Sequence, residues 1–176
     1  MKKYVEIYWS SIMGGICLSF GIAAYLVVLT LTNNNAIAAC IFPVGLFLCY
    51  KLGGNLFTTD IIKLHDAKKE NSYTIKYYWT RLAATLIANL LSVNIMGLIF
   101  ALLITPKAQM FINTSWSNKL IGLETHNYLS LCIFIAIVLL KSILCNFLIC
   151  STYTLHKNHP VLGIFIPVYL FVILGL

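Results

Sequence analysis

Charged residues are scarce in this sequence. They make up 10% of the 176 residues, whereas a soluble domain carries about a quarter. Only five residues are acidic, and Asp60 and Asp66 lie at the cytoplasmic edge of an apolar segment without the acidic cluster of a metal-dependent lipid transferase. The sequence also lacks a G-x-S-x-G motif and a glycine-rich phosphate loop. We therefore expect a membrane protein rather than a soluble domain, and no enzymatic activity.

Patterns of metal ligands are missing as well. The six cysteines lie within apolar stretches, and no pair of them has the spacing of a zinc site. His156 and His159 are close in sequence but have no third ligand, so we expect them to be solvated loop residues. We expect no metal site and no cofactor, and cysteines that pack as small hydrophobic side chains. These cysteines are Cys17, Cys40, Cys49, Cys132, Cys145 and Cys150.

Long apolar runs are what the sequence does contain, since 60% of its residues are hydrophobic. Such runs predict an all-α, multi-pass membrane protein with a single transmembrane domain over residues 1–176. The last run has 16 residues, fewer than the roughly 20 that a spanning helix needs. About five transmembrane segments are expected, at 7–31, 36–54, 82–104, 128–152 and 161–176.

Small and polar residues interrupt these runs. Gly14, Gly15 and Gly21 in the first run predict a helix that packs closely against its neighbours. Asn89 and Asn94 in the third run predict a helix face that contacts protein or water.

The positive charges predict the orientation of the chain. The formal net charge is +7, but the basic residues sit in short loops, which is typical of a topology signal rather than of nucleic-acid binding. The opposite loops hold only Lys107 and Lys119, so the N-terminus is expected in the cytoplasm. The basic residues of the cytoplasmic side are Lys2, Lys3, Lys63, Lys68, Lys69, Lys76, Arg81 and Lys157.

The second run ends in residues that do not favour a helix. Residues 53–60 read Gly-Gly-Asn-Leu-Phe-Thr-Thr-Asp, and adjacent glycines are poor helix formers. Non-helical backbone at membrane depth persists only where it is buried in protein or lines a polar cavity. The sequence therefore predicts a broken helix beside a permeation pathway.

An internal repeat links the second and fifth runs. Phe-Pro-Val-Gly-Leu-Phe at 42–47 is similar to Ile-Pro-Val-Tyr-Leu-Phe at 166–171, an offset of 124 residues. This predicts an inverted 3+3 repeat whose second and fifth segments run in opposite directions. The counterpart of the first break falls at 177–179, so we expect the sequence to end within an element, with the C-terminal end of the repeat missing.

Two motifs resemble those of the formate/nitrite transporter family. They are Gly-Asn-Leu-Phe-Thr at 54–58 and Ile-Leu-Cys-Asn-Phe-Leu-Ile-Cys at 143–150. The resemblance implies an aquaporin-like fold and a homopentamer in the cell membrane, in contact with lipid. It also implies that each protomer conducts small monovalent anions such as formate, nitrite or hydrosulfide, with proton coupling as an open alternative to a plain channel.

The resemblance also implies roles for individual residues. Asn146 would be a polar residue behind the pore, and Lys141 a basic residue that attracts anions. The cytoplasmic constriction would consist of Leu56, Phe57, Thr58 and Ile149, and the extracellular one of Phe42 and Phe171.

Simpler interpretations of these residues remain open. The two phenylalanines are also what a core or a lipid-facing surface would contain, and Thr58 would also satisfy backbone groups freed by the break. Lys141 would also suit a side chain that snorkels to the interface or binds a neighbouring chain.

A second function class also remains open. In the family, a pore histidine neutralises the anion between the constrictions, and its position would lie two residues after Leu176. We therefore expect no anion flux from the 176 residues alone and flux from a version extended through a sixth helix. The alternative function is that of a truncated, non-transporting membrane protein with a structural or subunit role.

Overall fold

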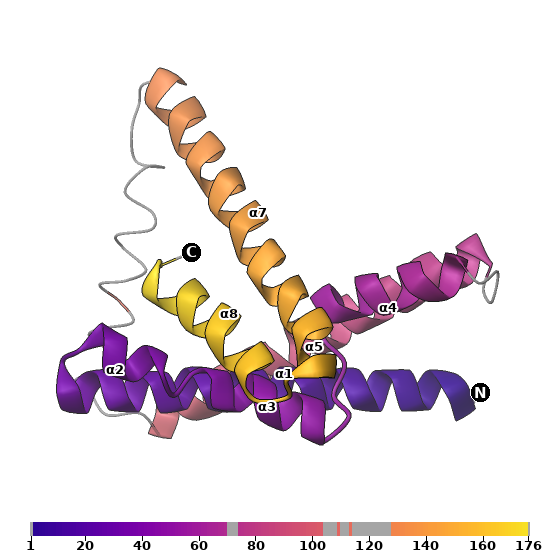
Figure 1. The fold of residues 1–176 in the computed structure, drawn as a ribbon, viewed down its shortest axis with the longest axis horizontal. Coiled ribbons are helices and arrows are strands. Elements are labelled where there is room, and N and C mark those ends of the chain that lie inside the picture. Colours follow the sequence, from indigo (N-terminus) through magenta and orange to yellow (C-terminus); the bar gives the residue numbers. More distant parts are fainter. Residues whose placement is uncertain (1, 70–73, 104–108, 110–112, 114–127, 176) are drawn as a thin grey trace.

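The computed structural model describes residues 2–69, 74–103, 109, 113 and 128–175. This part of the chain contains helices and turns but no strand, which confirms the predicted all-α fold (Figure 1). In chain order the helices are α1 (Lys2–Thr32), α2 (Asn35–Ala39), α3 (Pro43–Lys51), α4 (Phe57–Lys69), α5 (Ile75–Leu103), α7 (Tyr128–Asn158) and α8 (Leu162–Ile173).

Three of these helices, α1, α5 and α7, are long and apolar enough to cross a membrane. Helix α5 begins seven residues before the predicted start at 82, because the Thr74 hydroxyl accepts a hydrogen bond from Tyr77 N at 3.3 Å and caps the helix there. Helix α7 continues to Asn158, so the basic turn predicted at 156–160 starts later. The end of the third run at 104 and most of the polar loop predicted at 106–127 lie outside the described residues.

The second run forms three helices instead of one long helix and a short continuation. The Asn34 side chain caps α2 by accepting hydrogen bonds from Ala36 N at 2.9 Å and Ile37 N at 3.3 Å. A turn at 40–42 then precedes Pro43, which occupies the first turn of α3, where proline is favoured because it has no N–H to leave unpaired. Beyond the break, α4 extends to Lys69, well past the predicted end near Ile62.

Helix α1 lies against α5 and against α2 and α3 (Figure 1). The contact with α3 brings two backbones together, since a Cβ added at Gly45 would lie 2.7 Å from both Gly21 Cα and Cys17 O. A Cβ added at Gly15 would likewise meet the Ser92 side chain of α5. The prediction that the first segment is a packed helix is therefore confirmed.

Helices α7 and α8 form a V-shaped pair that stands out from the α1–α3 layer (Figure 1). Helix α8 packs against α7 and α3, whereas most of α7 is exposed. The core joins α1, α3, the break and α8 through six buried side chains, with Phe42, Phe47, Tyr50 and Ile149 packed against them. The six are Cys17, Leu46, Cys49, Leu56, Ile164 and Val168.

The cysteines do not share one environment. Cys17 and Cys49 are buried in the core, as predicted. Cys132, near the start of α7, is exposed. The prediction of small buried side chains therefore fails for Cys132.

Candidate functional site

The predicted break in the second segment is present. Helix α3 ends at Lys51, and Gly53 adopts φ of 69°, a left-handed conformation that favours glycine. Gly54 N then donates to Cys49 O at 2.8 Å, and the helical conformation resumes at Phe57. The chain therefore passes through about one turn of non-helical backbone between two helices.

Helix α1 pairs the polar groups at the start of this break. Asn55 N donates to Ser10 O, and Asn55 Nδ2 donates to Ser10 Oγ, both at 2.9 Å. Lys63 Nζ donates to Asn55 Oδ1 at 2.8 Å from the side of α4. Gly14 allows this contact, since a Cβ there would overlap the Asn55 carbonyl.

Asn89 of α5 pairs the polar groups at the end of the break. Its Oδ1 accepts from Phe57 N at 2.9 Å, and its Nδ2 donates to Asn55 O at 3.0 Å and Ser11 O at 2.6 Å. The sequence marked Asn89 only as a polar residue on a helix face. Its partners lie 32 to 78 residues away along the chain, so no local pattern identified them.

Asp60 is fully buried, although the sequence placed it at the membrane edge. Its carboxylate accepts two hydrogen bonds from Arg81, from Nε at 3.1 Å and from Nη2 at 2.9 Å. The Thr85 hydroxyl donates a third at 2.9 Å. This bidentate ion pair ties α4 to α5, and the attraction compensates for removing both charges from water.

The residues predicted for the cytoplasmic constriction lie on both sides of the α4–α7 contact. Leu56 is buried in the core, and Ile149 of α7 packs against the same cluster. Phe57 and Thr58 are half-buried at the start of α4. The Cys150 thiol approaches Thr58 O at 3.8 Å, which brings α7 directly beside this turn of α4.

The two phenylalanines predicted for the other constriction are in contact. The ring centroids of Phe42 and Phe171 are 6.0 Å apart with an angle of 60° between the rings. Tyr25 of α1 packs edge-on against Phe42 at 6.3 Å, so three aromatic rings gather at this end of α3 and α8.

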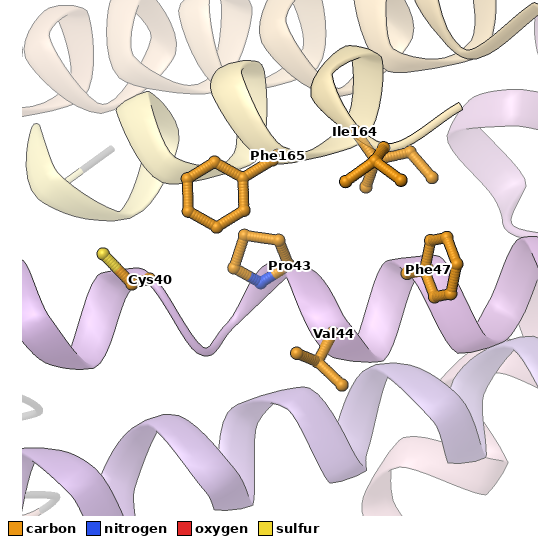
Figure 2. A pocket seen from close by; sticks show the side chains of 7 residues that line it. Cys40, Pro43, Val44, Phe47, Ile164 and Phe165 are labelled. Carbon is orange, nitrogen blue, oxygen red and sulfur yellow. The ribbon is translucent and has the colours of Figure 1, made fainter. Parts of the chain in front are cut away.

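Helices α3 and α8 run antiparallel, as the inverted repeat predicts. Phe42 at the start of α3 meets Phe171 near the end of α8, and Phe47 lies across from Ile164 near the start of α8 (Figure 2). Each helix ends at a glycine in the left-handed conformation, Gly53 at φ 69° and Gly175 at φ 63°. The two repeated segments therefore lie side by side and run in opposite directions.

An apolar pocket of about 210 Å³ lies between α3 and α8 (Figure 2). Pro43 and Phe47 of α3 face Phe165 and Ile164 of α8 across it. The remaining lining residues are Cys40, Val44 and Val161. None of the described residues that line this pocket is charged, so they offer no favourable partner to a hydrated ion.

Two residues of the predicted pathway lie apart from these clusters. Asn146 is exposed on α7, and its Nδ2 donates to Ser142 O of the same helix at 2.9 Å. Lys141 is also exposed, and its Nζ donates to Gly175 O at 3.1 Å. Lys141 thus interacts with the negative end of the α8 dipole.

An aromatic cluster at the end of α7 was not predicted. His156 was expected to be a solvated loop residue, but it is half-buried and stacks on Tyr50 with ring centroids 4.6 Å apart. The Tyr50 hydroxyl is 3.2 Å from Thr152 Oγ1, which joins α3 to α7. The nitrogens of Lys63 and Lys157 lie 5.9 and 4.7 Å from the Tyr153 ring centre, so two cations meet one ring.

The family model described as formate/nitrite transporter matches residues 1–176. The chain belongs to the formate/nitrite transporter family. No curated protein matches the chain. Membership of the formate/nitrite transporter family assigns the chain to anion transport and to small anions as substrates, and its long apolar helices make it a multi-pass membrane protein.

Proposed function

We propose that this chain forms a channel-like pathway for small monovalent anions of the formate, nitrite or hydrosulfide class. The observation that carries the proposal is the antiparallel pair of α3 and α8. This pair has the Phe42–Phe171 contact at one end, and α3 leads into the break at the other. An interrupted helix beside a repeated segment that runs in the opposite direction is typical of membrane transport sites.

The proposed pathway combines apolar constrictions with a dipole that favours anions. Helix α4 begins at Phe57, so the positive end of its dipole points at the break. Apolar side chains resist the passage of an ion that keeps its hydration shell. We therefore infer that the anion crosses together with a proton, as the neutral acid. The proposed lining residues are Phe42, Leu56, Phe57, Thr58, Asn146, Ile149 and Phe171.

Lys141 is the proposed anion-attracting residue near one mouth of the pathway. Its ammonium group is exposed next to the end of α8, close to the half-helix that carries Phe171. A positive charge in such a position raises the local concentration of anions.

The proposed assembly is a homopentamer, in which each protomer holds its own pathway. The outer surfaces of α5 and α7 are exposed and apolar, with Leu102 87% and Phe147 69% exposed. Such surfaces suit lipid chains or neighbouring protomers. Native mass spectrometry of the detergent-solubilised protein is expected to show five copies, and a monomer under all mild conditions would contradict the pentamer.

The test of the proposed function is anion flux into proteoliposomes. We expect the protein extended through a sixth helix, the form for which the sequence predicts flux and the one used in every flux measurement below, to pass formate, nitrite or hydrosulfide faster than protein-free vesicles do. Phe42→Ala is expected to relax the preference for these anions over a larger carboxylate such as butyrate by on the order of tenfold, because it widens one constriction. Phe147→Ala on the exposed face of α7 is the matched control and should leave the preference unchanged.

Two results would contradict the proposal. Correctly inserted protein that passes no anion would favour the non-transporting subunit. Equal selectivity in Phe42→Ala and Phe147→Ala would show that Phe42 does not line the pathway.

A further inference from the structure

The backbone of the break is held by a side chain from α5. We infer that Asn89 is a positioning residue for the constriction at Leu56 and Phe57, an inference that rests on the proposed function. Its amide fixes the peptide groups on both sides of Leu56 and so sets how these two side chains meet the anion pathway.

Three hydrogen bonds make Asn89 the link. Its Oδ1 accepts from Phe57 N, and its Nδ2 donates to Asn55 O and to Ser11 O. The bonds to Phe57 and Asn55 enclose Leu56, and the bond to Ser11 fastens the same amide to α1. Only a side-chain amide offers one acceptor and two donors in this arrangement.

The Phe57 N–H that Asn89 pairs has no partner within its own helix. Phe57 is the first residue of α4, and the first N–H groups of a helix have no partner within it. An unpaired peptide group at membrane depth is costly, so loss of Asn89 favours a rearranged break.

The other end of the break is held independently. Asn55 N and Nδ2 both bind Ser10, and Gly14 of α1 lies against the Asn55 carbonyl. The α1 contacts therefore hold Asn55, whereas the position of Phe57 relative to α1 depends on Asn89. Loss of the Asn89 hydrogen bonds should move the start of α4, while α3 and α8 keep their contact.

Asn89→Asp tests this role because its effect depends on protonation. An ionised carboxylate accepts from Phe57 N but cannot donate to Asn55 O or Ser11 O, whereas the protonated acid regains one donor. We expect anion flux relative to wild type to be about tenfold lower near roughly pH 8 and to recover toward about pH 5, a range that covers a carboxyl pKa raised by burial.

Asn94→Asp is the matched control on the same helix. Asn94 is exposed, and its Nδ2 donates to Leu90 O of α5 at 2.7 Å. Its flux ratio to wild type should stay constant with pH. The charged groups around the break are Glu6 of α1, Asp60 and Lys63 of α4, and Arg81 of α5, and both variants retain them.

A second measurement does not need transport. Cys49 is 2% exposed, and a Cβ added at Gly54 would lie 2.8 Å from its sulfur. The rate at which its thiol is labelled therefore measures how accessible the break is. We expect Asn89→Asp to raise the rate of maleimide labelling of Cys49 by about tenfold, because the hydrogen bonds that keep the break closed are lost. Mass spectrometry follows the labelling. Asn94→Asp should label as slowly as wild type.

The outcomes separate the two proposals. If wild type passes no anion, the proposed function fails, and Cys49 labelling still tests Asn89. If wild type transports and Asn89→Asp matches Asn94→Asp in flux profile and labelling, the role of Asn89 is overturned. If Asn89→Asp does not fold, Asn89→Ser, whose shorter side chain cannot bind both Phe57 N and Asn55 O, should also raise Cys49 labelling, and unchanged labelling would overturn the inference.

Discussion

Polar side chains at the break replace the helical hydrogen bonds that its backbone lacks. Ser10 and Asn89 pair the peptide groups of Asn55 and Phe57, while Asp60 and Arg81 hold the first turns of α4 against α5. A membrane interior provides no water to take these roles. Ser10, Asn55 and Asn89 therefore gather at a place where regular structure is interrupted.

Removing one partner of the buried ion pair should destabilise the protein strongly. Among the described residues, Arg81→Met leaves the buried Asp60 carboxylate with the Thr85 hydroxyl as its remaining side-chain donor, and such a change costs about 3–5 kcal/mol. The double variant Asp60→Asn with Arg81→Met should recover much of this loss. The measurement is the free energy of unfolding in detergent, followed by circular dichroism.

Lys76→Met on the same helix is the control for the ion pair. Lys76 is exposed and near the start of α5, so its loss should change stability by less than about 0.5 kcal/mol. A loss of stability in Arg81→Met no larger than that in Lys76→Met would show that the pair contributes nothing.

Among the elements, the broken second segment shows what the sequence could predict. Two adjacent glycines and a threonine pair marked the break, and a left-handed Gly53 makes it. The apolar pattern predicts one continuous segment across Pro43, whereas the structure has a turn before this proline and starts α3 there. The start of α5 was missed because the capping residue, Thr74, lies in a polar stretch outside the apolar pattern.

The features that the sequence did not predict depend on contacts between elements that are distant along the chain. The partners of Asp60, Asn89 and His156 lie on other helices or across a turn, and hydrophobic periodicity says nothing about such pairs. The sequence predicts the pairing of Phe42 with Phe171 only through the internal repeat and the family resemblance that link their segments. Packing therefore decided which polar residues came together.

The approach of α1 to the break depends on a residue without a side chain. A Cβ at Gly14 would overlap the carbonyl of Asn55, a backbone atom that cannot move away without moving the break. Gly14→Ala is therefore expected to destabilise the protein by about 1–3 kcal/mol and to raise Cys49 labelling. Thermal unfolding in detergent measures the first effect and mass spectrometry the second.

Gly97→Ala on α5 provides the comparison for this change. No atom of the described residues lies within 4 Å of a Cβ added at Gly97, and alanine favours a helix over glycine by roughly 1 kcal/mol. Gly97→Ala should therefore leave stability unchanged or raise it. A stable Gly14→Ala protein with slow Cys49 labelling would show that α1 does not hold the break.

At the scale of the whole molecule, the N-terminal part of α1 and the start of α5 lie at the same end of the bundle. Glu6 and Ser10 of α1, Asn55 of the break, and Tyr77 and Arg81 of α5 line one pocket of about 280 Å³. Lys63, which binds Asn55, belongs to this end too. Two of the basic residues that predict a cytoplasmic face, Lys63 and Arg81, therefore lie at the same end of the bundle.

This arrangement predicts that the N-terminus and the connection between α4 and α5 share the cytoplasmic side. An epitope placed before Met1 or between Glu70 and Asn71 should be accessible to protease in inside-out vesicles and protected in spheroplasts. The physical reason is that a cluster of lysines and arginine resists translocation across the membrane. An epitope between Ser115 and Trp116 is the control and should show the reverse pattern. Protection of the first two epitopes in inside-out vesicles, with the control exposed there, would invert the proposed orientation and move the break to the external side of the membrane.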